Sequence, residues 1–148
     1  MKNRVIFIGK TGCGKTTLCQ KLDELTIKYK KTQTVEIYNN AIDTPGEFLE
    51  NKQYYSAIIV SAVDAEMVAV VADPTVDENF IPPSLAGTFN KEMIGIITKR
   101  SIVKDNTLLL KARNALEQAG SSQIFEVDTI YDVGVEDLFK YINDKLRG

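Results

Sequence analysis

The sequence predicts a three-layer α/β fold, in which a mostly parallel sheet carries helices on both faces. Short apolar runs recur along the chain, and segments whose apolar residues have helical spacing separate them. Strands that alternate with helices favour a parallel sheet, because each crossover returns the chain to the same end of the sheet. The chain has 148 residues, of which 44% are hydrophobic, which is enough for one core. We therefore expect a single domain that spans residues 1–148.

The predicted strands are runs of branched apolar residues, which are typical of strands buried on both faces of a sheet. These runs are Arg4–Ile8, Met67–Val71, Met93–Ile97 and Ile124–Val127. A further segment, Val35–Tyr38, alternates between apolar and polar residues and predicts a half-buried strand. We expect a tight turn at Asn39–Asn40 to return the chain through Ala41–Ile42.

The predicted helices are segments with apolar residues three and four positions apart. They run from Lys15 to about Glu24, within Asn51–Val63, from Leu108 to Ala119 and from Val135 to Leu146, with a short one between Pro83 and Phe89. Residues 28–34 are polar and aperiodic and predict a loop. Within Asn51–Val63 a strand at Ala57–Val60 is the alternative, and we favour the helix.

Composition excludes several classes of function. A net charge of −2, from 18 basic and 20 acidic residues, offers no broad attraction to nucleic acid or to an anionic membrane. The sequence has no His and only the cysteines Cys13 and Cys19, which argues against His-based triads, a zinc site and a disulfide framework. No apolar run reaches the roughly 18 residues that a membrane-spanning helix needs. We expect a cytoplasmic protein with free thiols and with neither nucleic acid nor a membrane as partner.

The most specific motif follows the first predicted strand and opens the first helix. Residues 9–16 match the pattern G-x-x-x-x-G-K-[ST] at Gly9, Gly14, Lys15 and Thr16. Glycines in this P-loop let backbone N–H groups converge on phosphate oxygens at a helix N-terminus. Lys15 should bind the β- and γ-phosphates and assist catalysis, and the Thr16 hydroxyl should bind Mg²⁺. The predicted nucleotide contacts here are Gly9, Lys10, Thr11, Gly12, Cys13, Gly14, Lys15, Thr16 and Thr17.

A second motif, Asp43-Thr44-Pro45-Gly46, follows a predicted strand. An ordinary turn is the alternative reading, since turns use these residue types. After a P-loop, however, such an Asp holds Mg²⁺ and the glycine N–H contacts the γ-phosphate. Between the two motifs, Thr32 is the favoured further metal ligand, with Thr34 or an ordinary polar loop as alternatives. The two motifs together predict a Ras-like P-loop NTPase fold that binds GTP or ATP with Mg²⁺.

Several segments resemble the ethanolamine- and propanediol-utilisation P-loop family (EutP/PduV type). They are Lys31-Thr32-Gln33, Ile42–Glu47, Tyr55-Ser56-Ala57, Phe89-Asn90-Lys91 and Ile94–Lys99, within a resemblance that runs from about residue 4 to residue 143. It implies a Ras-like fold, Mg²⁺-nucleotide binding and a bacterial context of ethanolamine or propanediol breakdown. That context is often linked to protein-shelled microcompartments, whose shell or enzyme proteins would be partners.

Two positions depart from related nucleotide switches. Guanine-specific relatives carry [NT]-K-x-D, whose Asp binds the guanine edge, whereas this chain has Thr98-Lys99-Arg100-Ser101. Thr98 and Lys99 remain candidate nucleotide contacts, but Ser101 stands in place of the Asp, so base choice stays open between GTP and ATP. We expect weak discrimination in the wild type and a higher GTP preference in Ser101→Asp. Asp128 and Thr129 fall near the expected base-contacting loop.

The second departure concerns hydrolysis. Glu47 stands where Ras-type enzymes use a Gln to orient the attacking water, so intrinsic hydrolysis should be slow. Glu47 is a candidate catalytic residue beside Lys15, with a solvated loop carboxylate as the alternative. The Cys13 thiol would act as a redox gate only with a lowered pKa.

Three functions fit these features. The leading one is a slow NTPase that acts as a switch or accessory factor in ethanolamine or propanediol utilisation. The second is a small-molecule kinase that transfers the γ-phosphate of ATP to a short carboxylate. The third is a non-enzymatic, nucleotide-holding interaction module of microcompartments.

Overall fold

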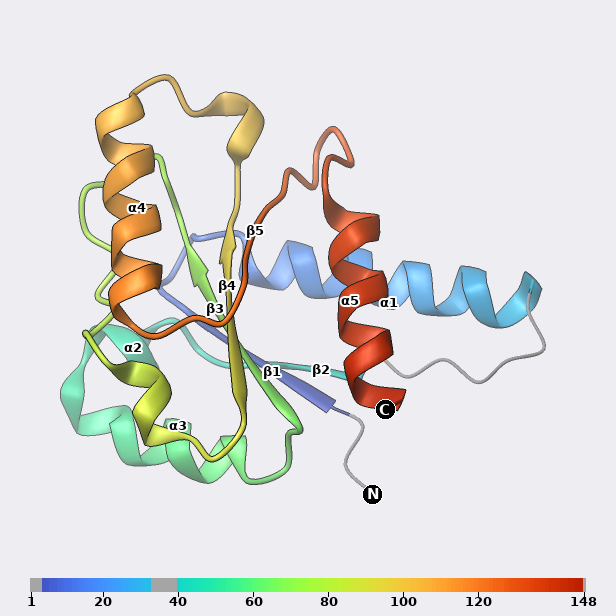
Figure 1. Cartoon of the computed structure of the whole chain (residues 1–148), viewed down its shortest axis with the longest axis horizontal. Coiled ribbons are helices and arrows are strands. Elements are labelled where there is room, and N and C mark those ends of the chain that lie inside the picture. Colours follow the sequence, from blue (N-terminus) through green and yellow to red (C-terminus); the bar gives the residue numbers. More distant parts are fainter. Residues whose placement is uncertain (1–3, 33–39, 148) are drawn as a thin grey trace.

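Five parallel strands in the order β2-β1-β3-β4-β5 form the sheet (Figure 1). The computed structural model describes residues 4–32 and 40–147. The strands are β1 (Arg4–Gly9), β2 (Asn40–Asp43), β3 (Met67–Ala72), β4 (Glu92–Ile97) and β5 (Ile124–Glu126). The predicted α/β fold with a mostly parallel sheet is confirmed. The strand predicted at Val35–Tyr38, and Asn39 in the turn after it, lie outside the described residues.

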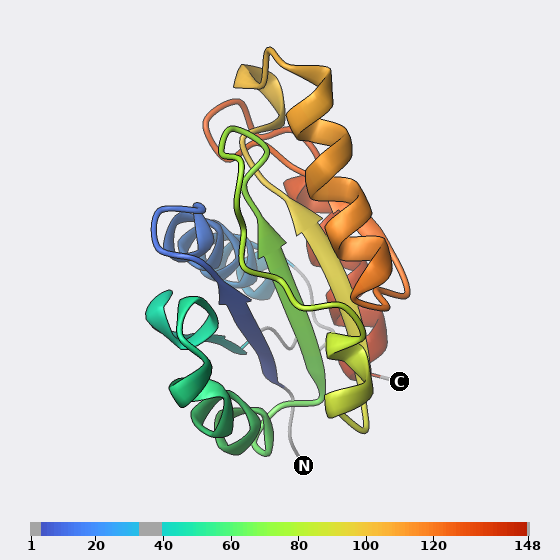
Figure 2. The same cartoon turned by 90° about the vertical axis from the view of Figure 1, so that its left-hand side faces the viewer.

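Helices cover both faces of the sheet (Figure 2). One face carries α1 (Lys15–Thr32) and α5 (Val135–Arg147), and the other carries α2 (Glu47–Glu50), α3 (Tyr55–Ala62) and α4 (Asn106–Gln118). Short 3-10 turns are η1 (Lys52–Tyr54), η2 (Leu85–Thr88) and η3 (Arg100–Ile102). Among residues 4–32 and 40–147, no helix has the length and hydropathy of a membrane-spanning segment.

Side chains of the central strands alternate between two apolar cores. Val5 and Phe7 of β1 pack in the core under α1 and α5, whereas Ile6 and Ile8 pack in the core under α2, α3 and α4. All four are fully buried, because successive side chains of a strand point to opposite faces. This double burial explains why β1 reads as a continuous apolar run.

Helix α1 is longer than the sequence indicated. We expected it to end near Glu24 and residues 28–34 to form a loop, but α1 continues to Thr32. Leu25 and Tyr29 extend its apolar stripe onto the core, and the ring of Tyr29 lies 5.3 Å from that of Phe139 on α5. The lysines of this segment make it polar overall, so its helical pattern is weak in the sequence. The segment is helical because Leu25 and Tyr29 pack against the core that α1 shares with α5.

The remaining helix predictions hold with adjusted bounds. Segment 51–63 is a helix, as favoured, and it begins at Tyr55 after η1. The short helix predicted before Phe89 is the 3-10 turn η2. Helix α2, of only four residues, was not predicted, because one turn is too short to establish a periodicity.

The order of the strands reverses between β1 and β3. From β1 the chain crosses to β2 on one side, and from β3 it crosses to β4 on the other side. In open α/β sheets, ligands bind in the crevice beyond the carboxyl ends of the strands at such a reversal. The loop after β1, which carries the P-loop motif, therefore opens at the position where this fold class binds its ligands.

Candidate functional site

The residues singled out in the sequence gather at the carboxyl edge of the sheet. Each strand contributes the loop that follows it: residues 9–16 after β1, Asp43–Gly46 after β2, Asp73 after β3, residues 98–101 after β4 and Asp128 after β5. Because all five strands are parallel, all five loops emerge at the same edge. Segments more than 100 residues apart in the sequence thus form one site.

The P-loop, residues 9–16, owes its shape to glycine. Gly12 and Gly14 have φ angles of 81° and 95°, a left-handed conformation that residues with a Cβ adopt only under strain. Helix α1 begins immediately afterwards at Lys15. Its first N–H groups have no partner within the helix, so they and the helix dipole favour an anion at this point.

Two side chains from the loop after β4 hold the carbonyl groups of the P-loop. The Thr98 hydroxyl donates a hydrogen bond to the carbonyl oxygen of Cys13 at 2.5 Å. The Lys99 ammonium donates to the carbonyl oxygen of Gly12 at 2.8 Å. These donors occupy carbonyl oxygens that would otherwise repel a phosphate, and they fix the loop to the sheet.

Asp73, which the sequence analysis did not single out, in turn holds Lys99. Its carboxylate is 1% exposed and lies 2.7 Å from the Lys99 ammonium. It also accepts hydrogen bonds from the backbone and the hydroxyl of Thr75. Burial raises the pKa of this carboxyl, but the bonds from Lys99 and Thr75 outweigh burial and leave the pKa below its usual value. Its place directly after a buried strand is the signal that could have identified it.

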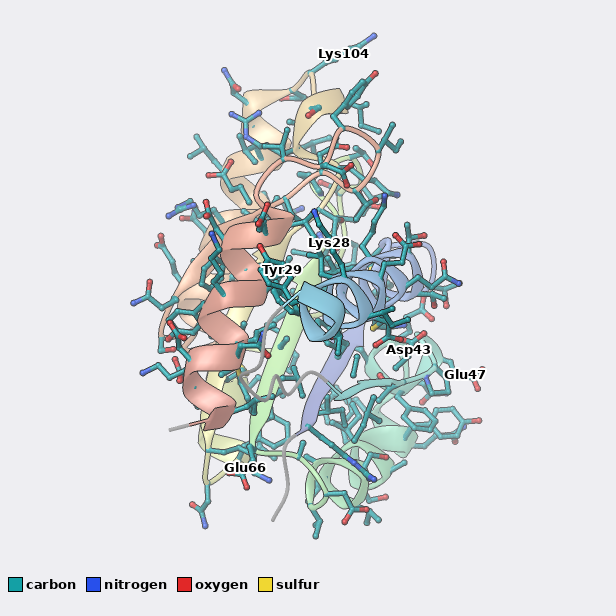
Figure 3. The ribbon with its side chains drawn as sticks, turned by 90° about the vertical axis from the view of Figure 1, so that its right-hand side faces the viewer. Lys28, Tyr29, Asp43, Glu47, Glu66 and Lys104 are labelled. Carbon is teal, nitrogen blue, oxygen red and sulfur yellow. The ribbon has the colours of Figure 1, made fainter. Side chains whose placement is uncertain are left out.

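Lys15, Thr16 and Asp43 are in direct contact. The Lys15 ammonium lies 2.9 Å from one carboxylate oxygen of Asp43, and the Thr16 hydroxyl donates to the other at 2.6 Å. Lys15 is buried, whereas Asp43 is partly open to solvent beside α1 (Figure 3). The predicted phosphate-binding lysine and two of the three predicted metal ligands, Thr16 and Asp43, therefore form one cluster.

This cluster fits a magnesium ion. A hydroxyl and a carboxylate oxygen are the hard ligands that Mg²⁺ prefers, and Mg²⁺ usually takes one or two protein ligands with phosphates and waters supplying the rest. Within residues 4–32 and 40–147, no group of three or more acidic or Cys side chains forms a metal cage. Thr16 and Asp43 are the two residues here that would hold the ion. Thr32 ends α1, but its side chain and all of Thr34 lie outside the described residues.

Gly46 brings the second loop against the P-loop. A Cβ atom built on Gly46 would lie 2.2 Å from the backbone nitrogen of Thr11, a distance that no side chain tolerates. The Thr11 hydroxyl donates to a carboxylate oxygen of Glu50, on α2, at 3.1 Å. The two loops are therefore packed together, and α2 is tied to the P-loop.

The two acidic residues of α2 differ in position. Glu47, the predicted catalytic candidate, is the exposed first residue of α2, and its label lies at the outer edge of the molecule in Figure 3. It does not line the cavity formed by the P-loop and the loop after β2. Glu50 contacts the P-loop instead, and no local pattern in the sequence signalled this, because the contact depends on the direction of α2.

Three consecutive cavities share lining residues and together form what we call the groove. The first, of about 400 Å³, lies between Thr11, Lys15, Thr16 and residues 43–46. The second, of about 330 Å³, follows residues 12–17 and also contacts Lys10 and Lys99. The third, of about 190 Å³, is lined by Gly14, Thr17, Thr98, Lys99, Ile102 and residues 128–130. The groove thus contacts every predicted nucleotide-binding residue except Gly9, which packs against Cys13 and Val71 below the loop.

Asp128 and Ser101 meet at the third cavity. The Asp128 carboxylate accepts hydrogen bonds from the backbone N–H groups of Ser101, Ile130 and Tyr131 at 3.1, 2.9 and 3.0 Å. Burial raises the pKa of this carboxyl, but these N–H donors and the Ser101 hydroxyl outweigh burial and lower the pKa. Thr129, the other predicted residue of this loop, also lines the cavity.

The Cys13 thiol lacks the property that a redox gate needs. Cys13 is 1% exposed, and burial raises the pKa of its thiol above the ordinary value. Burial also raises the pKa of Cys19, to about 12. Both cysteines behave as small apolar core residues.

The contact between the two loops gives a first prediction. We expect Gly46→Ala to lower the free energy of unfolding by about 1–3 kcal/mol, because its methyl group overlaps the backbone of Thr11. Gly87→Ala is the matched control, since a Cβ there meets nothing within 4 Å, and its change should stay within about 0.5 kcal/mol. Urea unfolding measures both. Equal stability of the two variants would contradict the close approach.

The buried carboxylate of Asp73 gives a second prediction. Its folded-state pKa is lowered, so its contribution is complete above the unfolded pKa of about 3.9 and is lost as the pH falls through the folded value. Asp73→Asn should therefore lose about 1–3 kcal/mol at about pH 7, and its difference from wild type should shrink only below about pH 4.

The control for this second prediction is Asp77→Asn. The Asp77 side chain is 82% exposed and pairs with Lys111, so we expect little change in unfolding free energy at any pH. Urea unfolding of both variants over a pH series measures the difference. A constant deficit of Asp73→Asn down to the lowest pH would show that the carboxylate charge is not what stabilises the site.

Comparisons with known proteins identify the family of the chain. The model of the ethanolamine utilisation and propanediol utilisation family (PduV-EutP) matches residues 1–144. The propanediol utilization protein PduV of Citrobacter freundii is 34% identical over 142 residues, which cover 96% of this chain and 94% of that protein. The probable acetate kinase EutP of Escherichia coli (strain K12) is 30% identical over 141 residues, covering 94% and 88%.

A further relative extends the comparison to part of the chain. The probable acetate kinase EutP of Salmonella typhimurium is 35% identical over 99 residues, which cover 65% of this chain and 62% of that protein. The family match and the relatives that span nearly the whole chain agree with the resemblance seen in the motifs. On this evidence the chain belongs to the PduV-EutP family of ethanolamine and propanediol utilisation proteins.

Proposed function

We propose that this chain binds a nucleoside triphosphate, GTP or ATP, with Mg²⁺ in the groove and hydrolyses the γ-phosphate slowly. It would act in the cytoplasm as a switch or accessory factor in ethanolamine or propanediol utilisation, with enzymes or shell proteins of a microcompartment as partners. The observation that carries the proposal is the cluster of Lys15, Thr16 and Asp43 directly at the start of α1. The family match supports the pathway.

The chemistry of binding follows from these residues. Backbone N–H groups of the P-loop and of the first turn of α1 bind the phosphate oxygens. Lys15 exchanges its Asp43 partner for the β- and γ-phosphate oxygens, where its charge stabilises the transition state. Thr16 and Asp43 would hold Mg²⁺, which would supply neutralisation of phosphate charge. Gly46 lies against Thr11, and in this proposal the Gly46 N–H donates a hydrogen bond to the γ-phosphate when that phosphate is present.

Hydrolysis is slow in this proposal because neither acidic residue of α2 is placed to orient the attacking water. Glu47 is exposed and away from the first cavity, and Glu50 is engaged with the Thr11 hydroxyl. Positioning and charge stabilisation by the P-loop remain, and these supply only part of the acceleration seen in Ras-type enzymes.

Thermal denaturation with and without nucleotide tests the binding proposal. At about 100 times the dissociation constant, Mg²⁺ with ATP or GTP should add about 2.7 kcal/mol, a shift of a few degrees. Lys15→Ala should lose most of this shift, and so should wild type in excess EDTA. Lys140→Ala removes an exposed lysine of α5 as the matched control and should behave like wild type. No shift with any triphosphate would refute the proposal.

A second candidate function is transfer of the γ-phosphoryl group of ATP to a short carboxylate. Two relatives bear the description probable acetate kinase, and the first cavity, of about 400 Å³ beside Lys15, has room for a small acceptor. In this reaction a carboxylate oxygen attacks the γ-phosphorus, the bond to the bridging oxygen breaks, and ADP leaves with that oxygen. A carboxylate has no proton to lose, so the reaction needs no general base and the exposed position of Glu47 is no obstacle.

Labelled ATP distinguishes the two candidates. With γ-labelled ATP and Mg²⁺, the hydrolase releases label only as inorganic phosphate, at a rate that acetate or propionate leaves unchanged. The kinase instead transfers label to the acid, and hydroxylamine traps the acyl phosphate as a hydroxamate. We expect slow release of phosphate and no hydroxamate, with Lys15→Ala abolishing release. Hydroxamate that requires both the acid and Lys15 would establish the kinase in its place.

A further inference from the structure

The Ser101 backbone binds a carboxylate at the third cavity. The N–H of Ser101 donates to one oxygen of Asp128 at 3.1 Å, and the Ser101 side chain helps to lower the pKa of the same carboxyl. Ser101 lies in η3, after β4, and Asp128 follows β5. The carboxylate at this end of the groove therefore comes from the loop opposite the position where guanine-specific relatives carry theirs.

Asp128 is unavailable to a ligand. Its second oxygen accepts from the N–H groups of Ile130 and Tyr131, and the residue is 1% exposed. Its own backbone pairs with Val133 through two hydrogen bonds of 2.8 and 3.0 Å. The carboxylate thus closes its own loop, and its two oxygens are occupied by three backbone N–H donors.

Two other polar side chains around the third cavity are also engaged. The Thr98 hydroxyl binds the carbonyl of Cys13, and the Lys99 ammonium binds Gly12 and Asp73. The remaining side chains that line the cavity are the hydroxyl-bearing Thr17 and Thr129 and two apolar residues, of which Ile102 is 45% exposed and Ile130 is 73% exposed. Among the described residues that line it, Asp128 is the only one with a carboxylate.

These contacts decide what a base would meet. Guanine presents two adjacent N–H donors, which need a paired acceptor such as a free carboxylate, and sites that supply one reject a base without those donors. Apolar side chains contact the faces of any base equally well. The third cavity therefore offers a base apolar surface and two hydroxyls, but no free carboxylate to pair with the edge of guanine.

We propose that the backbone N–H groups of Ser101, Ile130 and Tyr131 withhold the Asp128 carboxylate from the base, so that guanine selectivity requires the exchange of Ser101 and Asp128 for each other. The inference rests on the proposed nucleotide binding and adds how the base is chosen. Wild type should bind GTP and ATP with similar affinity.

The structure changes what Ser101→Asp alone should do. A carboxylate introduced at position 101 lies close to the Asp128 carboxylate, because the backbone nitrogen of residue 101 is 3.1 Å from it, and neighbouring like charges cannot both stay ionised without cost. The GTP preference expected from the sequence should therefore be small in this variant. In the exchange Ser101→Asp/Asp128→Ser, the hydroxyl introduced at 128 donates to the carboxylate introduced at 101, which leaves that carboxylate free to accept from guanine.

Competition of unlabelled GTP and ATP against a fluorescent nucleotide, with Mg²⁺ and the full chain, tests the inference. Wild type and Asp128→Ser should show a GTP-to-ATP affinity ratio within about tenfold of one, and Ser101→Asp should change the ratio by less than about threefold. The exchange variant should favour GTP by roughly thirtyfold or more. Ser56→Asp adds the same charge at an exposed position of α3 and should leave the ratio at its wild-type value.

A thermal melt of every variant shows that it is folded. If Asp128→Ser unfolds the loop, Asp128→Asn takes its place, because the amide oxygen can still accept from Ile130 and Tyr131. A wild type that prefers either nucleotide more than a hundredfold, or a Ser101→Asp variant as selective as the exchange variant, would overturn this inference alone. Absence of binding to any nucleotide by wild type would overturn the proposed function and this inference with it.

Discussion

The site depends on the hydrogen bonds that hold the carbonyl oxygens of the P-loop. Thr98 and Lys99, which directly follow β4, bind the carbonyls of Cys13 and Gly12, and Asp73 at the end of β3 holds Lys99 in place. A loop of this sequence has two glycines in left-handed conformations and would otherwise sample many shapes. These hydrogen bonds fix the geometry of the P-loop. Lys15 with its partner Asp43, and Gly46 packed against Thr11, are positioned by the same loop.

Much of the architecture could be predicted from the sequence because it depends on local pattern. Strands β1, β3 and β4 are mainly apolar runs, and their burial on both faces of the sheet explains why the sequence pattern identifies them. The P-loop and Asp43-Thr44-Pro45-Gly46 could be found from spacing, because each motif lies within one short segment of the chain. The helix predicted from Lys15 to about Glu24 is too short, because the burial of Leu25 and Tyr29 depends on α5. Helix α5 lies more than 100 residues later in the sequence.

The details of the site could not be predicted in the same way. Glu50 contacts Thr11 only because α2 leaves Gly46 in a particular direction, and Asp73 matters only because β3 and β4 are neighbours. The partnership of Ser101 and Asp128 joins two loops that follow different strands. A sequence pattern indicates which functional groups are present. The contacts above determine which of those groups remain free to bind a ligand, and the packing of the whole sheet determines the contacts.

The ion pair between Lys15 and Asp43 has a consequence for how anions reach this protein. The ammonium is buried and its charge is already balanced at 2.9 Å, in a chain whose net charge is −2. A balanced pair projects little field beyond about a Debye length, so it cannot steer a polyanion from a distance. The rate at which a phosphate ligand binds then depends on diffusion and on how fast Lys15 exchanges the Asp43 carboxylate for a phosphate oxygen. This rate should respond only weakly to ionic strength, unlike that of proteins that capture phosphates with an exposed cationic patch.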